Sequence, residues 1–251
     1  MNQFNSSPLS NIPEVVKNLL ILNVIVYIAT VYLFPQTYDM FAMHFVKNEA
    51  FKPFQIVTHM FMHSNVGIAH IFFNMFGLWM FGSTLERVWG PKRFFIFYFI
   101  AGLGAIFLYM LIDVIQFNQL INSFSPGQIK NIYESTVFNG QISWYNVPGN
   151  DAAAVKKAVL IYNSSIVGAS GAIFGIFVAF GMLFPNTELM LIFFPVPIKA
   201  KYFIPIMIVL ELFLGVGNFR WDNIAHFAHL GGALFGFIMV KIWSRDRTKF
   251  Y

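Results

Sequence analysis

The chain of 251 residues is 57% hydrophobic and only 11% charged, and its mean hydropathy is +0.64. Soluble domains carry about a quarter charged residues, so this composition excludes an ordinary soluble protein and indicates a membrane protein. The net charge of +5 does not indicate nucleic-acid binding, because the basic residues are scattered between apolar blocks, and the absence of cysteine excludes disulfides and thiolate chemistry.

Apolar stretches of about 20 residues are long enough to cross a bilayer as α-helices. Six stretches meet this criterion, so the sequence predicts an all-α membrane protein with a six-transmembrane-helix bundle. Residues 15–245 are expected to form one membrane domain between an N-terminal tail (1–14) and a C-terminal tail (246–251). In chain order, the predicted spans are Val15–Phe34, Ile68–Val88, Phe94–Ile115, Ser165–Phe184, Tyr202–Val216 and Ile224–Trp243.

Two connections between the predicted spans are too long to be simple turns. Pro35–Gly67, the long first outer loop, is rich in Phe, Met and His and is expected to lie partly in the membrane interface. Residues 116–163 contain turn-forming sequences such as "NSFSPGQ" and "NVPGND" and are expected to form a long polar loop in water. The opening "MNQFNSSPLSNIPEVVKNLL" has neither a basic start nor a small-residue cleavage site, so no cleavable signal or transit peptide is expected.

Basic residues in the connections orient the bundle, because the cytoplasmic loops of membrane proteins are enriched in Lys and Arg. If the N-terminus is cytoplasmic, the inner connections hold more basic residues than the outer ones, and the C-terminal "KIWSRDRTKFY" carries most of this excess. We therefore expect both termini on the cytoplasmic side.

The motif "GASGAIFG", at Gly168–Gly175, places a serine among glycines near the outer end of the predicted fourth span. Counted from Ser165, Ser170 lies about 7–8 Å below the start of this span. A lone serine in a membrane helix usually bonds back to a carbonyl or packs against a neighbour. Here Gly168 and Gly171 favour a loop-to-helix transition at the serine, where free N–H groups could stabilise an oxyanion.

The segment "DNIAHFAHLGGALFG", at Asp222–Gly236, brings a histidine to the same predicted depth as Ser170. His229, Gly232 and Gly236 are spaced i, i+3 and i+7, so they share one helix face on which a partner helix can approach closely. A buried histidine is usually a structural, hydrogen-bonded residue. The matching depth instead favours His229 as the base that a serine nucleophile needs.

A carboxylate that could orient His229 is not evident from the sequence. Glu211 falls in the fifth span, and Asp222 lies nearly two turns from His229 at the mouth of the sixth. Neither is expected to be well placed, so the sequence predicts a Ser170–His229 dyad. His226 lies a turn nearer the surface without a glycine at i+3, and it is interpreted as a neighbour that bonds water or the loop.

The second span carries a polar pair in "AHIFFNMFGLWMFG", at Ala69–Gly82. His70 and Asn74 are spaced i, i+4 and therefore share one face in the outer part of the span. Their imidazole and amide N–H groups could stabilise an oxyanion, and the alternative is a polar pair that holds two helices together.

Histidines are also metal ligands. His59, His63 and His70 share one region of the chain, and His226 and His229 share another. The chain has no HExxH motif, and no intramembrane carboxylate is expected near either group. The sequence therefore predicts no metal site and no cofactor.

Three motifs together resemble those of the rhomboid intramembrane serine proteases: "GASGAIFG", "AHLGGALFG" at Ala228–Gly236 and "HIFFNMFGLWMFG" at His70–Gly82. The "TLERVWG" at Thr84–Gly90 is similar to the second-span exit of that family. The short Gly/Ser pattern alone is moderately specific, whereas all three motifs in this order are highly specific. The resemblance extends over roughly residues 15–245 and makes the predicted fold a rhomboid-like bundle.

The resemblance implies a role for each candidate site residue. Ser170 would be the nucleophile and His229 its general base. His70 and Asn74 would form the oxyanion hole together with the backbone N–H of Ser170. Four structural glycines would shape the serine loop or let the sixth span pack on the fourth, namely Gly168, Gly171, Gly232 and Gly236.

The resemblance also implies an activity, that of a serine endopeptidase cutting transmembrane segments of membrane proteins near the outer face of a bacterial cytoplasmic membrane. The expected partners are transmembrane protein substrates and membrane lipid, with no nucleic acid or metal. The alternative is a catalytically inactive relative that binds transmembrane helices. A third hypothesis, a small-solute transporter, predicts paired half-helices or intramembrane charges in repeated halves, and the sequence shows neither. The sequence does not determine the substrate, the oligomeric state or the role of residues 116–163.

Overall fold

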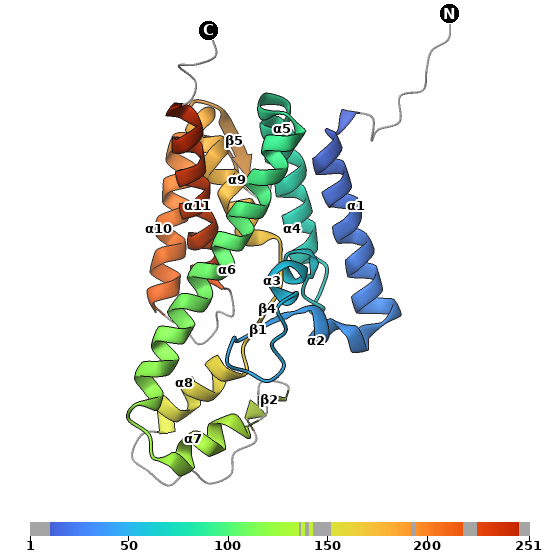
Figure 1. Ribbon diagram of the computed structural model, residues 1–251. Helices are drawn as coiled ribbons and strands as arrows, with labels where there is room; N and C mark the ends of the chain where they lie inside the picture. The colour runs from blue at the N-terminus through green and yellow to red at the C-terminus, as the bar shows by residue number, and fades with distance from the viewer. Residues whose placement is uncertain are drawn as a thin grey trace, which may run out of the picture.

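The computed structural model describes residues 11–135, 137–138, 141–142, 152–191, 194–217 and 225–245. Its long helices stand side by side in a bundle, and α7 and α8 form a smaller lobe beyond one end of that bundle (Figure 1). The bundle helices are α1 (Glu14–Ile28), α4 (Ala69–Gly77), α5 (Ser83–Trp89), α6 (Pro91–Ile121), α9 (Ser170–Leu183), α10 (Ala200–Gly217) and α11 (His226–Arg245).

Shorter elements connect the bundle helices. The short α-helices are α2 (Tyr38–Phe41), α3 (Gln55–Thr58), α7 (Pro126–Tyr133) and α8 (Ala152–Tyr162). The π-helical and 3₁₀ segments are η2 (Ala29–Leu33), η3 (Pro35–Thr37), η4 (His59–Phe61) and η5 (Leu78–Gly82). The described strands form antiparallel pairs: β1 (Met43–His44) with β4 (Ser165–Ile166), β2 (Val137–Phe138) with β3 (Gln141–Ile142), and β5 (Glu188–Leu191) with β6 (Phe194–Lys199).

Within the described residues, 4 helical segments are long and apolar enough to cross a membrane. They are Glu14–Leu33, Pro91–Ile121, Ala200–Gly217 and His226–Ser244, and they correspond to the predicted first, third, fifth and sixth spans. The chain is therefore a mostly helical membrane protein, as its composition predicts, and the count of six spans stays a prediction.

The other two predicted spans differ from simple membrane helices. The second is helical from Ala69 to Trp89, but the π-helical η5 interrupts it and charged Glu86 and Arg87 lie near its end. The fourth forms α9, which has 14 residues and is about 21 Å long, shorter than a hydrocarbon core of about 30 Å. Because most side chains of α9 are buried against other helices, its length does not need to match the bilayer.

The predicted start of the fourth span, at Ser165, is wrong. Residues Ser165 and Ile166 are extended and pair with β1, in the register Met43 to Ile166 and His44 to Ser165. Helix α9 begins only at Ser170, so the serine is the first residue of its helix rather than the sixth. The apolar pattern alone cannot separate a short buried strand from a helix turn, and pairing with a distant segment decides the matter.

Small residues allow α9 and α11 to pack backbone against backbone. A Cβ atom placed on Gly232 would overlap the backbone oxygen of Gly171, and one on Gly236 would lie 2.7 Å from the Cα of Gly175. Within lipid, helix association depends on such close packing because lipid tails are as apolar as the side chains. These contacts fix how α11 lies on α9, and through α11 they fix the position of His229.

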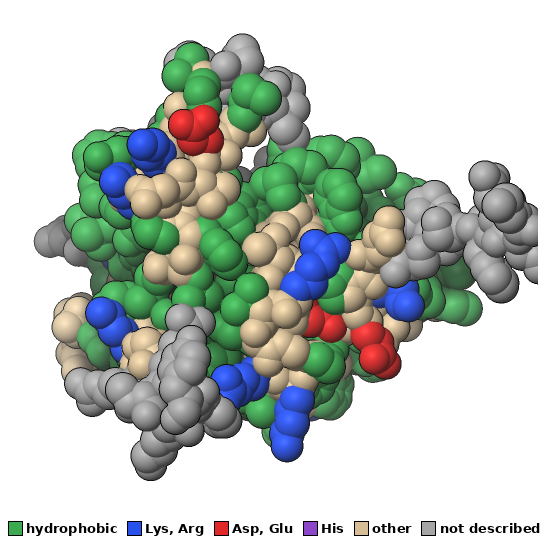
Figure 2. Space-filling model, turned by 90° about the horizontal axis from the view of Figure 1, so that it is seen from above, with side chains coloured by type: hydrophobic (Ala, Val, Ile, Leu, Met, Phe, Trp, Pro, Cys, Tyr) green, Lys and Arg blue, Asp and Glu red, His purple; other side chains and the backbone are tan. Residues whose placement is uncertain are grey.

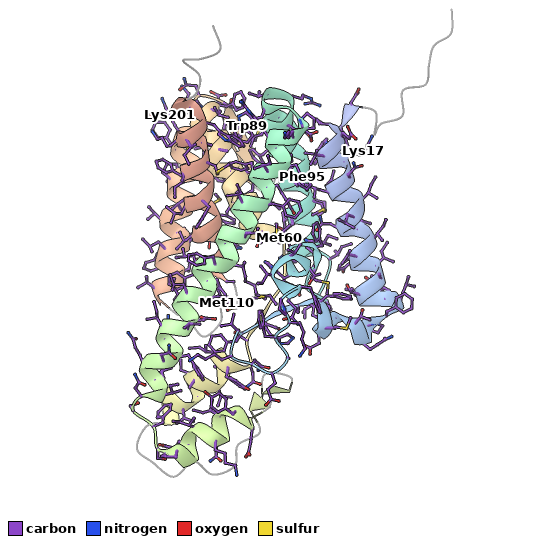
Figure 3. All side chains as sticks on the ribbon, in the orientation of Figure 1. Lys17, Met60, Trp89, Phe95, Met110 and Lys201 are labelled. Carbon is purple, nitrogen blue, oxygen red and sulfur yellow. The ribbon has the colours of Figure 1, made fainter. Side chains whose placement is uncertain are left out.

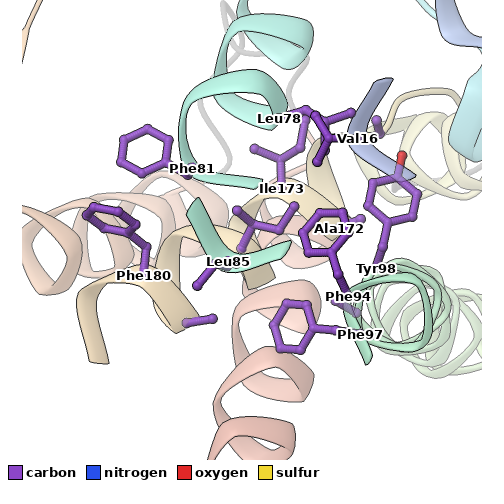
Figure 4. Packing of buried hydrophobic residues seen from close by; sticks show 14 of the residues in the cluster. Val16, Leu78, Phe81, Leu85, Phe94, Phe97, Tyr98, Ala172, Ile173 and Phe180 are labelled. Carbon is purple, nitrogen blue, oxygen red and sulfur yellow. The ribbon is translucent and has the colours of Figure 1, made fainter. Parts of the chain in front are cut away.

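The main core lies where α9 meets the helices on its other sides. In Figure 4, Leu78, Phe81 and Leu85 from the second helical segment face Ala172, Ile173 and Phe180 from α9, beside α6. The labelled aromatic side chains of α6 are Phe94, Phe97 and Tyr98, all with 0% exposure. Helix α9 is therefore closely packed against the second helical segment and α6.

The segment 116–163 differs from the predicted polar loop. Helix α6 continues to Ile121, and α7 and α8 follow it, so much of the segment is helical. These helices have an apolar core of their own, which extends to Met43 and Phe45 of the first outer loop. Its other buried members are Ile106, Met110, Phe117, Ile132, Val155, Ala158, Val159, Ile161 and Tyr162. The turn-forming sequences of this segment therefore did not predict that its helices pack into a small lobe.

Gln55 organises the segment between the first two helical spans. Its side chain is buried and makes hydrogen bonds through both the amide oxygen and the amide nitrogen. The oxygen accepts from the backbone N–H groups of His44 and Lys52, and the nitrogen donates to the carbonyls of Met40 and Ala50. One side chain thus fixes the loop that carries β1 and His59.

The start of α1 and the end of α11 lie at the same end of the bundle (Figure 1). Lys17 and Lys201 lie at this end as well (Figure 3), and Lys and Arg side chains are spread over it in the view from above (Figure 2). The carboxylate of Glu86 accepts hydrogen bonds from the backbone N–H groups of Val15 and Val16, at 2.9 and 2.8 Å. This buried carboxylate caps the N-terminus of α1.

Candidate active site

Ser170 stands at the first position of α9, after a turn that requires glycine. Gly168 has a φ of 134°, a conformation that side chains other than glycine rarely adopt, and its N–H donates to the carbonyl of His59 over 2.9 Å. The first N–H groups of a helix have no partner within the helix, and the helix dipole makes that end positive. The hydroxyl of Ser170 therefore lies beside a site suited to an anion.

His229 contacts Ser170 directly. Its Nε2 lies 2.9 Å from the Ser170 Oγ, and its ring is stacked on Phe174 with centroids 4.1 Å apart and planes 8° from parallel. The histidine is only 9% exposed. Stacking on an aromatic ring of the same helix that carries the serine limits the rotation of the imidazole and keeps Nε2 directed at the hydroxyl.

The expectation that Glu211 is poorly placed is wrong. Its Oε2 lies 3.0 Å from Nδ1 of His229 and 2.6 Å from Nδ1 of His226. His226 also faces this carboxylate on α10, a contact that was not expected from the sequence. Sequence spacing could not show that Glu211 lies near His229, since the two residues are on different helices. The presence of an ionisable residue in an apolar span nevertheless indicated that Glu211 has a functional contact.

These contacts define the tautomer of the His229 imidazole. An ionised carboxylate only accepts, so the proton on the ring lies on Nδ1 and is donated to Glu211. Nε2 then carries the lone pair and accepts the hydroxyl proton of Ser170. This is the protonation state that a general base requires.

His70 offers a proton to the same cavity. The backbone N–H of Ser64 donates to Nδ1 of His70 over 3.1 Å, so the proton of the neutral ring lies on Nε2. A Cβ atom on Gly168 would lie 3.0 Å from that Nε2 and 3.5 Å from the Oγ of Ser170. The glycine therefore leaves the imidazole N–H beside the serine.

Asn74 lies one turn further along α4 and is buried. Its Nδ2 donates one hydrogen bond to the carbonyl of His70, over 2.9 Å, and the amide carries a second N–H. Ser170, His229, His70 and Asn74 all line one cavity of about 1950 Å³. Three helices thus bring the four predicted side chains together.

The same cavity has a polar and an apolar part. Lys156 and Lys157 of α8 line it on the side of the small lobe. Aromatic and aliphatic side chains of α4, α9 and α10 line it within the bundle, including Phe73, Phe76, Phe177, Phe203 and Met207. The cavity is therefore suited to an apolar chain that meets polar groups near the serine.

His59 and His63 lie in the first outer loop, and His59 also lines the cavity that contains Ser170. His59 donates from Nδ1 to the carbonyl of Gln55, and the ring of His63 lies 5.3 Å from that of His70. Burial lowers the pKa of His59 to about 4, and burial with the neighbouring His70 lowers the pKa of His63 to about 3. Both are neutral at pH 7 and act as structural residues of the loop.

One group of side chains among the described residues could hold a metal ion. The ligand atoms of Glu211, His226 and His229 lie within 4.8 Å of one another. This differs from the expectation that no carboxylate lies near the second histidine group. His59, His63 and His70 do not form such a group within the described chain.

The chain is similar to a known protein family. The model of the Rhomboid domain family matches residues 50–246, which is most of the chain and includes every candidate residue named above. The chain belongs to the rhomboid family. The prediction of the family from its three motifs is therefore confirmed.

The chain is also similar to individual rhomboid proteins. Rhomboid protein 1, mitochondrial, of Saccharomyces cerevisiae is 26% identical over 184 residues, covering 72% of this chain and 40% of that protein. An uncharacterized mitochondrial rhomboid protein of Schizosaccharomyces pombe is 27% identical over 207 residues, covering 76% of this chain and 51% of the relative. RHOMBOID-like protein 12, mitochondrial, of Arabidopsis thaliana is 27% identical over 193 residues, covering 76% and 46%.

These relatives contradict the expected location. All of them are named as mitochondrial, which points to a mitochondrial membrane rather than to the bacterial cytoplasmic membrane that we expected from the motifs. The chain spans about half the length of the curated relatives that it matches. Membership of the family holds for the rhomboid domain.

Proposed function

We propose that this rhomboid protein is a serine endopeptidase that cleaves transmembrane segments of membrane proteins, with Ser170 as nucleophile and His229 as general base. The observation that carries the proposal is the 2.9 Å contact between His229 Nε2 and Ser170 Oγ, at the N-terminus of a buried helix. A serine hydroxyl is a weak nucleophile, and an adjacent base is the usual means of activating it.

In the first step, the Oγ of Ser170 attacks the carbonyl carbon of the scissile bond, and its proton moves to Nε2 of His229. The carbonyl π electrons move to the oxygen, which becomes the oxyanion. When the intermediate collapses, the C–N bond breaks and the proton on Nε2 moves to the leaving nitrogen. Water then attacks the acyl-serine ester with the same base, which releases the new carboxyl end and restores Ser170.

The oxyanion is stabilised by three N–H donors. They are the Nε2–H of His70, the second amide N–H of Asn74 and the backbone N–H of Ser170, and all three residues line the cavity. Each donor is held in place before the reaction: His70 by the N–H of Ser64, Asn74 by the carbonyl of His70, and Ser170 by its helix. Fixed donors in a site away from bulk water are the most effective form of such stabilisation.

The substrate enters from the lipid side of the same cavity. The apolar side chains of α4, α9 and α10 that line it suit a transmembrane helix, and lysines of α8 lie on the other side. Peptide bonds in a regular helix are protected by their hydrogen bonds, so cleavage takes place where the substrate unwinds near the polar part. Helix α10, which is mostly exposed in the isolated chain, moves to admit the substrate.

Six helical segments of the domain cross or line the membrane. The start of the first helix, α1, and the end of the last, α11, lie on the same side of it. The basic residues at that end favour the negative side of the membrane, and the active site opens toward the opposite side. By similarity to the mitochondrial relatives, the membrane is a mitochondrial one.

The test is cleavage of a reporter protein that carries a transmembrane segment, with purified enzyme in lipid vesicles. Ser170→Ala is expected to abolish cleavage and labelling by a fluorophosphonate probe. Ser83→Ala is the matched control, because Ser83 is also buried but its Oγ makes no hydrogen bond with the described residues and lies outside the cavity lining. Undiminished cleavage by Ser170→Ala would refute the proposal.

The alternative, an inactive rhomboid protein that binds transmembrane helices, predicts a different result. The wild-type protein would then bind the reporter without cutting it, and the probe would not label Ser170. Labelling that is lost in both Ser170→Ala and His229→Ala excludes this alternative.

A further inference from the structure

Glu211 is a carboxylate in a helix that is apolar apart from Lys201 in its first turn. It lies in the apolar helix Ala200–Gly217, and its neighbours in sequence, Leu210 and Leu212, are 54% and 50% exposed. The side chain of Glu211 itself is only 14% exposed and turns toward α11. A charged group at this position is costly in a membrane protein, so its contacts have to explain its presence.

The backbone of α10 comes close to α11 at this level. A Cβ atom on Gly215, one turn after Glu211, would lie 3.0 Å from the Cβ of His226. The short distance between the helices lets the glutamate reach both histidines of α11. The carboxylate, the two imidazoles and the serine thus belong to one continuous chain of contacts across α10, α11 and α9.

The hydrogen-bond pattern fits an ionised glutamate. The Nδ1 atoms of His226 and His229 both contact the same oxygen, Oε2, at 2.6 and 3.0 Å. An ionised carboxylate can accept from both ring N–H groups through this one oxygen. His226 anchors the carboxylate in one orientation, and the carboxylate in turn fixes Nδ1–H of His229.

We propose that Glu211 is a positioning residue for catalysis, so that the working site is Ser170–His229–Glu211 rather than a dyad. This inference rests on the proposed function of Ser170 and His229. Glu211 does not touch the substrate. It holds the tautomer in which Nε2 is free to take the hydroxyl proton, and its negative charge stabilises the imidazolium formed in that step.

The other groups described around His229 show why the negative charge of Glu211 matters for stabilising the imidazolium. His70 approaches from α4, and its ring carries no negative charge, while His226 lies on α11 itself. From α6, the residue that contacts the α9–α11 seam at this level is Ala105, and Tyr109 and Asp113 line the cavity one and two turns away. Among the described residues, Glu211 is thus the carboxylate in direct contact with the base.

The same three groups could instead be ligands of a divalent cation. A cation bound at the two Nδ1 atoms would replace their protons, and the proton of His229 would then lie on Nε2. In that tautomer Nε2 donates to Ser170 and cannot accept its proton, so a bound cation is incompatible with the proposed role. Activity that resists EDTA therefore supports the proposal, and activity that requires a divalent cation contradicts it.

The experiment compares the cleavage kinetics of Glu211→Gln and Glu211→Asp with the wild type, in the same vesicles. Glu211→Gln keeps the shape but removes the charge, so kcat is expected to fall about 10²-fold to 10³-fold while KM changes less than about twofold. Glu211→Asp keeps the charge and is expected to recover at least about tenfold of the loss. Leu212→Ala, on the lipid-exposed face of the same helix, is the control and should keep wild-type kinetics.

The results separate this inference from the proposed function. If Ser170→Ala is inactive but Glu211→Gln cleaves at the wild-type rate, the proposed protease function is supported and the proposed role of Glu211 is refuted. A purely structural role would lower the thermal unfolding temperature and raise KM, without rescue by Asp, and this also refutes it. If Glu211→Gln does not fold, Glu211→Leu removes the charge in its place, and a wild-type kcat of Glu211→Leu overturns the proposal.

Discussion

Replacing Gly232 by alanine tests whether backbone contact between α9 and α11 sets the catalytic geometry. The added methyl group would overlap the backbone oxygen of Gly171, which belongs to the first turn of α9 beside Ser170. Backbone atoms cannot move aside as a flexible side chain can, so the two helices have to separate. The hydrogen bond of 2.9 Å between Ser170 and His229 joins the same two turns and lengthens with them.

The structure gives the size of the effect. Separating the helices until the contact is an ordinary one requires a shift on the order of 1 Å, and a misplacement of this size in a catalytic pair costs about 10²-fold in rate. Overpacking of a closely packed interior costs about 1–3 kcal/mol in the free energy of unfolding. Gly232→Ala should therefore lose both activity and stability.

The assay is cleavage of the reporter together with thermal unfolding in the same detergent. Gly127→Ala is the matched control, because a Cβ on Gly127 in helix α7 would meet nothing within 4 Å. This control should keep full activity and the wild-type unfolding temperature, or a slightly higher one. If Gly232→Ala behaves like Gly127→Ala, the close approach of the helices does not position the catalytic pair.

Three further predictions follow from other parts of the structure. Glu86→Gln weakens the cap on α1 and should lower the free energy of unfolding by about 1–2 kcal/mol, measured by denaturation, with little change in KM. The neutral, buried His59 and His63 should make the protein less stable in acid: their folded pKa values lie below the unfolded value of about 6.5, so their contribution is complete above that pH and falls toward pH 4, by about 1 kcal/mol per histidine in the first pH unit. Unfolding temperatures measured from pH 7.5 to pH 5 check this, and a curve that is flat over this range contradicts it. His70→Ala removes an oxyanion donor and should lower kcat about 10²-fold to 10³-fold, and an unchanged kcat would remove His70 from the oxyanion hole.

The candidate site was mostly readable from short motifs, because their spacing is a local property. The serine among glycines, the histidine followed by Gly232 and Gly236, and the His70–Asn74 pair each lie within a few residues of one another in sequence. A helix converts such spacing into a shared face without help from the rest of the chain. The family and the helical membrane character could therefore be predicted and are confirmed.

The folded lobe at 116–163 could not be predicted, because its apolar residues are separated by turn sequences and are buried against one another, the first outer loop and α6. The depth argument for Ser170 also failed, since Ser165 and Ile166 are held by β1 and the helix starts later. Both errors have the same physical origin. Hydropathy measures the cost of exposing a residue to water, and it does not tell whether lipid or another part of the protein covers it.

The sequence by itself determined that the chain enters a membrane, which family it belongs to and which short motifs hold polar groups, since composition and helical spacing carry this information. Only the tertiary structure decided that Glu211 lies 3.0 Å from His229 and that Ser170 begins its helix. Glu211 and His229 are on different helices, and their distance depends on how α10 and α11 pack. That packing is set by side chains and glycines far apart in sequence, so no local pattern encodes it.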